Sequence, residues 1–243
     1  MEIISWQYIK LEINLIIRNK KPKENLYQII LIYLVMILMF MYINNNSNQI
    51  ITSTSPILTI FMSIFCGVFI YLHGLFLLTW ESTFFEGLNA LNINMFSFLK
   101  SKFWLLLLSM VLLLFVTSMI FLFSYRNFLF PLFAVTFFNA GICIFLIIIY
   151  SLFNNERAEL NKSIFLNNEG YGFWQYLFMM GLIALPTILI LFLRLFFNPN
   201  NTYIILVLLG ILSFLFSGYW FKTIHKIYIK RKYIILKKFN ERL

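Results

Sequence analysis

The stretch FWLLLLSMVLLLFVTSMIFLF, residues 103–123, runs for 21 residues without a charged side chain. A helix of that length, rising 1.5 Å per residue, crosses the roughly 30 Å hydrocarbon layer of a membrane. The whole chain has this character, because 61% of its 243 residues are hydrophobic and only 12% are charged. Soluble domains have about half their residues apolar and about a quarter charged. The sequence therefore predicts an all-α membrane protein.

Five further apolar runs give a total of six predicted transmembrane helices. The six spans are residues 26–43, 57–79, 103–123, 131–153, 173–197 and 202–221. Pro56 and Pro131 stand at or beside helix starts, where a missing backbone N–H costs nothing. The chain is then divided into an interfacial segment at 1–25, a six-helix domain at 26–221 and a basic tail at 222–243.

The basic residues predict how these spans are oriented. Of the 19 Lys and Arg residues, all but Arg126 and Arg194 lie in the two terminal segments or in the connections after the second and fourth spans. All nine acidic residues, each a glutamate, lie on the same side. Because Lys- and Arg-rich connections stay in the cytoplasm, we expect both termini to be cytoplasmic, in a multi-pass protein of the inner membrane. The net charge of +10 is largely explained by topology, and no nucleic-acid partner is expected.

The N-terminal segment, 1–25, fits two patterns. Residues 9–15 alternate between apolar and polar as in a strand, whereas a helix would bring four apolar residues into one stripe. These four are Ile4, Tyr8, Leu11 and Leu15. A lone strand at a membrane surface would leave backbone groups unpaired, so an interfacial amphipathic helix is favoured.

The tail at 222–243 also has two interpretations. As a helix, it would carry a basic face and an opposite apolar face made of Ile224, Ile227, Ile235 and Phe239. The basic face consists of Lys222, Lys226, Lys230 and Lys237. Such a helix binds anionic membrane lipids or a partner, and the alternative is a simple positive anchor.

The spans carry little chemistry. Cys66 and Cys143 lie within apolar runs and are interpreted as small apolar side chains. The sequence holds no metal-ligand spacing and no phosphate-binding loop, so we expect no catalytic residue, metal site or cofactor in this chain. The spans also contain no Asp, Glu or Lys, which disfavours an ion-coupled transporter.

Four residues are candidates for a transport pathway. His73, in the second span, either lines such a path or hydrogen-bonds a neighbouring helix. Pro186 is expected to kink the fifth span. Phe65 and Phe69 would give a pathway an apolar lining.

Small residues mark faces where helices can approach closely. One face combines Ser63, Gly67 and Gly74, and the other combines Gly210, Ser213 and Ser217.

One connection is too apolar for a plain solvated loop. Residues 80–102 read WESTFFEGLNALNINMFSFLKSK and join the second and third spans. Three apolar residues recur at i, i+4 and i+7, as in a short surface helix: Phe84, Leu88 and Leu91. With the carboxylates of Glu81 and Glu86, such a helix suits docking into a groove on another protein. The alternative is a helix that rests on the membrane interface.

This arrangement resembles the permease subunits of ABC-2-type transporters, an exporter class with six spans per subunit. The resemblance is carried by the topology and by WESTFFEGL at 80–88 and FLKSK at 98–102. In that family an amphipathic N-terminal helix precedes the spans, and a coupling helix after the second span docks on the nucleotide-binding subunit. Many members carry re-entrant helices between the last two spans. Here that connection is only residues 198–201, which argues against an elaborate outer gate.

The resemblance implies an ATP-driven permease that hydrolyses no ATP itself. A separate ABC ATPase subunit would bind ATP and Mg²⁺, and a second copy or a related permease would complete a dimer among the membrane lipids. The residues assigned to partner contact are Glu81, Phe84, Phe85, Glu86 and Leu88. The alternatives are a non-catalytic binding or accessory component of a transport complex and a secondary transporter.

Overall fold

The computed structural model of the chain describes residues 2–46, 55–90, 93–154, 156–162 and 173–240. Within these ranges the chain is helical and contains no strand. The helices of the bundle are α2 (Lys20–Asn46), α3 (Pro56–Gly74), α5 (Met95–Ser124), α6 (Leu129–Phe138), α7 (Ile144–Ser151), α8 (Phe173–Leu193) and α9 (Pro199–Leu215). The remaining elements are α1 (Glu2–Arg18), α4 (Phe85–Ala90), α10 (Ser217–Asn240), the 3₁₀ turns η1 (Thr79–Glu81) and η2 (Arg126–Phe128), and the π-helical turn η3 (Asn139–Cys143).

Five segments of the described chain are long and apolar enough to cross a membrane, which agrees with the first five predicted spans. They are Lys20–Asn45, Pro56–Glu81, Met95–Ser124, Arg126–Ser151 and Phe173–Leu193. The predicted sixth span, 202–221, falls on two helices that together are long and apolar enough to cross, but it is broken. Helix α9 ends at Leu215, α10 begins at Ser217, and the two are bent by 62°. The bend falls at a Ser-Gly pair, a common place for a helix to break.

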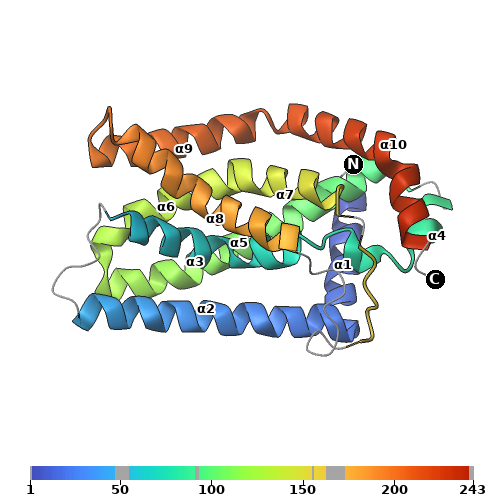
Figure 1. Cartoon of the computed structure of the whole chain (residues 1–243), viewed down its shortest axis with the longest axis horizontal. Coiled ribbons are helices and arrows are strands. Elements are labelled where there is room, and N and C mark those ends of the chain that lie inside the picture. Colours follow the sequence, from blue (N-terminus) through green and yellow to red (C-terminus); the bar gives the residue numbers. More distant parts are fainter. Residues whose placement is uncertain (1, 47–54, 91–92, 155, 163–172, 241–243) are drawn as a thin grey trace.

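The spans run side by side along the long axis of the molecule (Figure 1). Helix α3 is the central one, because α2, α5, α6, α7 and α8 all pack against it. In the α3 segment 83% of the residues are buried, against 22% in the α2 and α8 segments. Helices α2 and α8 therefore present apolar side chains outward, as a lipid-facing surface requires.

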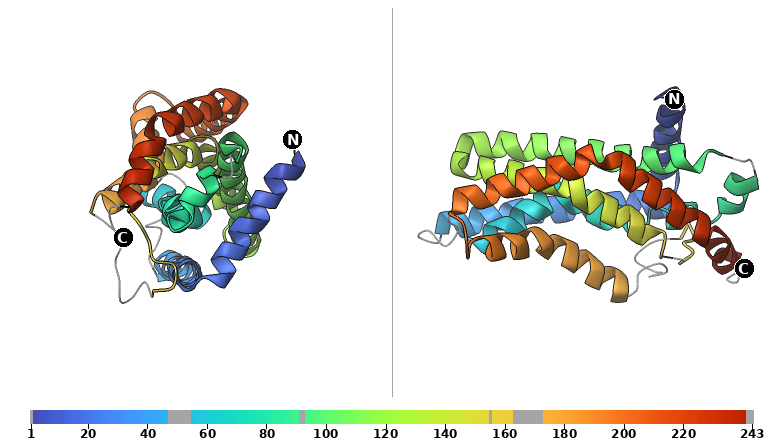
Figure 2. Two further views of the ribbon diagram at one scale, coloured as in Figure 1. Left: turned by 90° about the vertical axis from the view of Figure 1, so that its right-hand side faces the viewer. Right: turned by 90° about the horizontal axis from the view of Figure 1, so that it is seen from above.

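One end of the bundle carries three elements that lie outside its long axis. Helix α1 lies across that end, transverse to the long axis, α4 lies beside it, and the C-terminal half of α10 bends over it (Figures 1 and 2). The helical interpretation of the N-terminal segment is thus confirmed over Glu2–Arg18, in place of the strand. The same end holds the connection between α3 and α5, and we refer to it as the α1–α4 end.

Capping sets where α5 begins. The helix starts at Met95, before the predicted start at residue 103, because the Asn94 side chain accepts hydrogen bonds from the backbone N–H groups of Phe96 and Ser97. The apolar residues of the third span thus continue an already formed helix, and Lys102 lies within its first turns.

Two glycines let α9 approach the π-helical turn η3 closely. A side chain at Gly141 would collide with the Gly210 backbone, and one at Gly210 would collide with the Phe137 carbonyl. The Gly141 carbonyl also accepts a hydrogen bond from Ser213, whose oxygen accepts one from Trp220 Nε1 at 3.0 Å. The prediction of close approach along the face that contains Gly210 and Ser213 is confirmed.

Candidate functional site

The site is built where α3 ends. After Gly74 the chain makes a tight turn and then the single 3₁₀ turn η1, which delivers Glu81 to the α1–α4 end. Asn154 Nδ2 donates to the Leu75 carbonyl at 3.2 Å, and the Ala158 backbone N–H donates to Ser82 Oγ at 3.1 Å. The segment after α7 thus hydrogen-bonds to both ends of this turn, at Leu75 and at Ser82.

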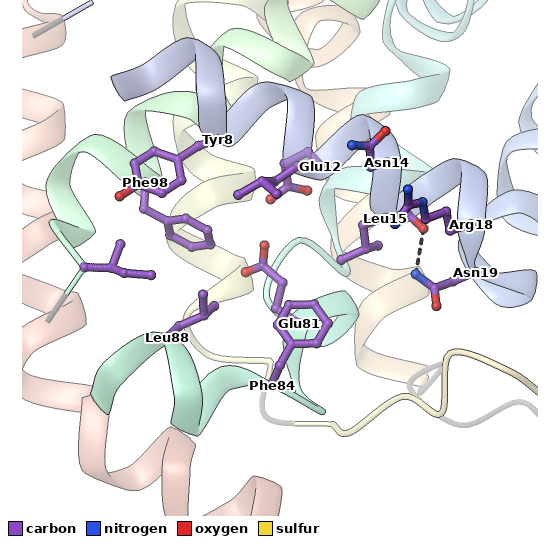
Figure 3. A pocket seen from close by; sticks show the side chains of 12 residues that line it. Tyr8, Glu12, Asn14, Leu15, Arg18, Asn19, Glu81, Phe84, Leu88 and Phe98 are labelled. Atoms are coloured by element: carbon purple, nitrogen blue, oxygen red, sulfur yellow. Dashed lines mark hydrogen bonds between the residues drawn. The ribbon is translucent and has the colours of Figure 1, made fainter. Parts of the chain in front are cut away.

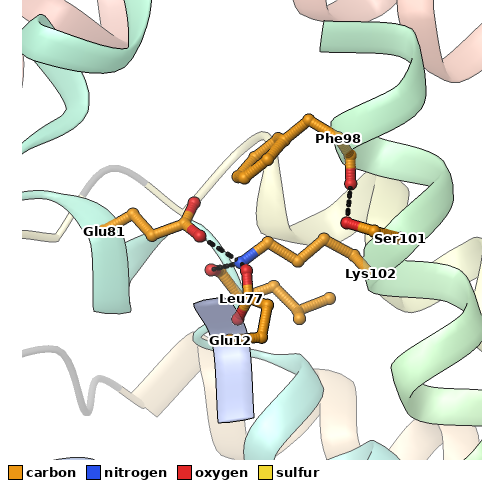
Figure 4. A network of polar contacts seen from close by, with 6 residues as sticks. All are labelled: Glu12, Leu77, Glu81, Phe98, Ser101 and Lys102. Carbon is orange, nitrogen blue, oxygen red and sulfur yellow. Dashed lines mark hydrogen bonds and ion pairs between the residues drawn. The ribbon is translucent and has the colours of Figure 1, made fainter. Parts of the chain in front are cut away.

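A buried ion cluster joins three parts of the chain at this turn. The Lys102 ammonium, on α5, pairs with Glu12 of α1 and lies 2.5 Å from Glu81 Oε1 (Figure 4). It also donates to the Leu77 carbonyl at 3.3 Å. The three charged side chains are at most 4% exposed. Because α1, η1 and α5 are far apart in sequence, the cluster fixes their relative positions.

The cluster holds two carboxylates and one ammonium group. Among the described residues, the second oxygen of Glu12 and that of Glu81 have no hydrogen-bond partner. A buried acceptor or charge without a partner is costly, and natural proteins place such groups mainly at functional sites.

A groove of about 350 Å³ lies beside the cluster, between α1 and α4 (Figure 3). The carboxylates of Glu12 and Glu81 point toward its interior (Figure 3). Its walls are largely apolar and aromatic, formed by Tyr8, Leu11, Leu15, Phe84, Leu88, Ile93 and Phe98. The polar lining is completed by Asn14, Arg18 and Asn19 of α1.

Helix α10 covers the neighbouring face of α4. The Phe85 ring makes edge contacts with Phe239 and Tyr228, at centroid distances of 5.5 and 6.4 Å. The Tyr228 hydroxyl and Asn89 Oδ1 are hydrogen-bonded at 2.8 Å, and Arg157 donates to the Phe239 carbonyl. The apolar face of the tail therefore packs on this chain.

The structure separates the five predicted partner-contact residues into two groups. Phe84 and Glu86 are exposed, and Leu88 is half-buried on the groove wall. Glu81 and Phe85 are buried against Lys102 and α10, so both contact this chain in the structure, and their contact with a partner stays a prediction. Leu91 of the predicted surface stripe lies outside the described residues.

The four predicted pathway residues are buried in this structure, and their role in a pathway stays a prediction. Phe65 and Phe69 are buried in the packing around α3, and Pro186 is buried within α8. His73 stacks between Phe69 and Trp80, with ring centroids 4.8 and 5.9 Å away. In place of the expected interhelical hydrogen bond, His73 Nε2 has no partner among the described residues.

The ion cluster is the feature that sequence reasoning missed. Glu12 sits about one helical turn from Tyr8 and about one from Leu15, on the apolar stripe of α1. A glutamate on an apolar stripe signals a buried, paired carboxylate. The described residues contain no group of three or more His, Cys, Asp or Glu that could hold a metal ion.

The fold and the site define an all-helical, multi-pass membrane protein with a grooved, charged end. No curated protein and no solved structure matches the chain. One family model matches residues 6–242, which is nearly the whole chain. The chain therefore belongs to DUF5687, described as a family of unknown function.

Proposed function

We propose that this protein is the transmembrane permease subunit of an ATP-driven ABC transporter of the exporter class. It would act as a dimer with a second copy or a related permease, and a separate nucleotide-binding subunit would bind ATP and Mg²⁺. The observation that carries the proposal is the position of α4. This short helix projects from the α1–α4 end, in the connection between the second and third spans, with Phe84 and Glu86 exposed.

The charge distribution supports an orientation with the α1–α4 end in the cytoplasm of a cell with an inner membrane. That end holds Lys10 of α1, Lys100 and Lys102 of α5, and the lysines of α10. The basic ends of membrane proteins stay on the cytoplasmic side. A soluble ATPase would then reach α4 directly.

Movement of α4 would pass to the spans through the ion cluster. When the ATPase closes on ATP, a shift of α4 would pull on Glu81 at its N-terminal side. Glu81 is paired with Lys102 of α5 and is joined to α3 through a tight turn and η1, so both spans would move with it. Such coupling would shift the two permease copies between inward-open and outward-open states. ATP binding would decide which state is favoured.

The expected contact with the ATPase is the exposed face of α4 together with Phe84, the residue just before it. Phe84 is 40% exposed and would enter an apolar groove on that subunit, while Glu86 would meet a basic residue beside it. Phe85 and Glu81 would keep α4 attached to its own chain. Without that attachment, movement of α4 could not be passed on to the spans.

Co-expression with an ATP-binding-cassette protein encoded beside this gene tests the proposal. We expect the two proteins to co-purify and the membrane subunit to stimulate ATP hydrolysis. The Phe84→Ala variant is expected to lose most of the stimulation. The control is Phe123→Ala, which changes an exposed ring at the opposite end of α5. Absence of a complex, or full stimulation by Phe84→Ala, would refute the proposal.

A further inference from the structure

The ion cluster at the α1–α4 end holds two carboxyl groups but only one ammonium group. Glu12 and Glu81 share the single ammonium of Lys102, and each glutamate keeps one oxygen without a partner among the described residues. Removing a carboxylate from water without compensation is expensive, so a cluster of this kind calls for a further positive charge.

The groove beside the cluster has the shape and lining for one long cationic side chain. The charge sits at its interior, whereas the walls are apolar and include the aromatic rings of Tyr8, Phe84 and Phe98. Aromatic faces attract cations, and apolar walls bury the methylene stem of a long basic residue. Arg18 lines the groove as well, but its side chain is exposed and lies beside Asn19, away from Phe98 (Figure 3).

We propose that the groove between α1 and α4 binds an arginine side chain presented by the nucleotide-binding subunit, with the guanidinium between the free oxygens of Glu12 and Glu81. This inference rests on the proposed function for the identity of the partner. The chemistry of the site itself depends only on the groove and the cluster.

Arginine fits better than lysine or a metal ion for two reasons. A guanidinium presents several N–H donors in one plane and pairs with two carboxylate oxygens at once. It is also less strongly hydrated than an ammonium group and stacks on aromatic rings. The bound arginine would complete the cluster with two positive and two negative charges and would lock α1 to α4.

The test uses N-acetyl-arginine amide as the probe, with N-acetyl-citrulline amide as its uncharged analogue. Leu11 lines the groove and is 61% exposed, so Leu11→Cys places a thiol there without disturbing the core. The native thiols of Cys66 and Cys143 are fully buried and are shielded from N-ethylmaleimide. The rate at which N-ethylmaleimide labels Leu11→Cys in the purified, detergent-solubilised protein is then measured with each probe.

We expect the arginine probe to protect the new thiol. With a dissociation constant on the order of 1 mM, about 10 mM probe would slow labelling about tenfold, and the citrulline probe would leave the rate unchanged. Glu81→Gln in the same background is expected to lose the protection. Glu86→Gln is the matched control, since it removes an exposed charge from α4 outside the groove lining and should keep the protection.

Three outcomes overturn the inference: no protection, equal protection by the two probes, or full protection in Glu81→Gln. The two probes are compared first on the Leu11→Cys protein that keeps Glu81. A folding defect of the glutamine variant does not affect that comparison. Failure of the proposed function looks different. If the arginine probe protects but no nucleotide-binding protein co-purifies, the groove is a cation site on a protein of another function.

Discussion

Lys102 Nζ of α5 and Glu81 Oε1 of η1 lie 2.5 Å apart, in the interior of the protein, across 21 residues of sequence that contain α4. Both ends of the α4 connection are thus joined at one point, and Glu12 joins α1 to the same point. The α4 connection is therefore a closed loop anchored by charge. Lys102 is the group that its two ends and α1 share.

Replacing Lys102 is expected to be among the most damaging changes at the α1–α4 end. Lys102→Met leaves two buried carboxylates without a partner, and breaking a buried ion pair from one side costs about 3–5 kcal/mol. The matched control is Lys100→Met in the same helix, where the side chain is half-buried and the effect should be small. Thermal unfolding in detergent measures both, and equal midpoints for the two variants would contradict the expectation.

Glu81→Gln is expected to raise the stability of the isolated protein. The substitution removes one of the two carboxyl groups that share Lys102 and leaves Glu12 and Lys102 as a pair, while the amide keeps the shape of the side chain. A gain of about 1 kcal/mol is expected, as is common when a strained functional site is relaxed. The measurement is the same thermal midpoint. A clear loss of stability would show that the Glu81 carboxylate stabilises the fold and is not kept for ligand binding.

Phe84 and Phe85 are adjacent but should respond in opposite ways to alanine. Phe85 is buried against Phe239 and Tyr228, so Phe85→Ala leaves a cavity and costs about 3–5 kcal/mol. Phe84 is 40% exposed, and Phe84→Ala should change the free energy of unfolding by no more than about 0.5 kcal/mol. Phe84 therefore reports on partner binding and Phe85 on the attachment of α10. A shared loss of stability would mean that α4 is packed differently.

The spans could be predicted because each needs only a long uncharged run, which hydropathy detects one segment at a time. The break in the last span could not be predicted, since apolar and aromatic residues lie on both sides of it and only Ser217 and Gly218 interrupt the pattern. Helix α10 was visible as an amphipathic pattern. Its apolar face could as well have met lipid, and only the three-dimensional arrangement shows that it covers Phe85.

The ion cluster lay beyond sequence reasoning for a different reason. Glu12, Glu81 and Lys102 belong to three segments that a sequence pattern treats as separate membrane-surface elements. Nothing local distinguishes a lysine that turns inward from one that anchors a helix end. The pairing is decided by the packing of α1 on α5 and α2 at the end of the bundle, a tertiary relationship that the sequence pattern does not show.

The start of α5 depends on Asn94. Its side chain accepts hydrogen bonds from two backbone N–H groups that the helix cannot satisfy by itself, those of Phe96 and Ser97. Asn94→Ala is therefore expected to cost about 1 kcal/mol. Asn94→Asp keeps an acceptor oxygen and should cost less. Thermal unfolding of the two variants decides, and equal losses would show that the cap is not what fixes the helix start.

The contact between α9 and η3 should tolerate no added methyl group. Gly210→Ala places a carbon against the Phe137 backbone carbonyl, which cannot move without shifting the whole of α6, so α9 must separate from the bundle. A loss of about 2 kcal/mol or more is expected, as for other overpacked interior positions. Gly181→Ala is the control, because a methyl group there meets nothing within 4 Å and alanine favours the helical state of α8. The thermal midpoint of Gly210→Ala should fall while that of Gly181→Ala stays level or rises, and a level midpoint for Gly210→Ala would mean that α9 does not lie this close to η3.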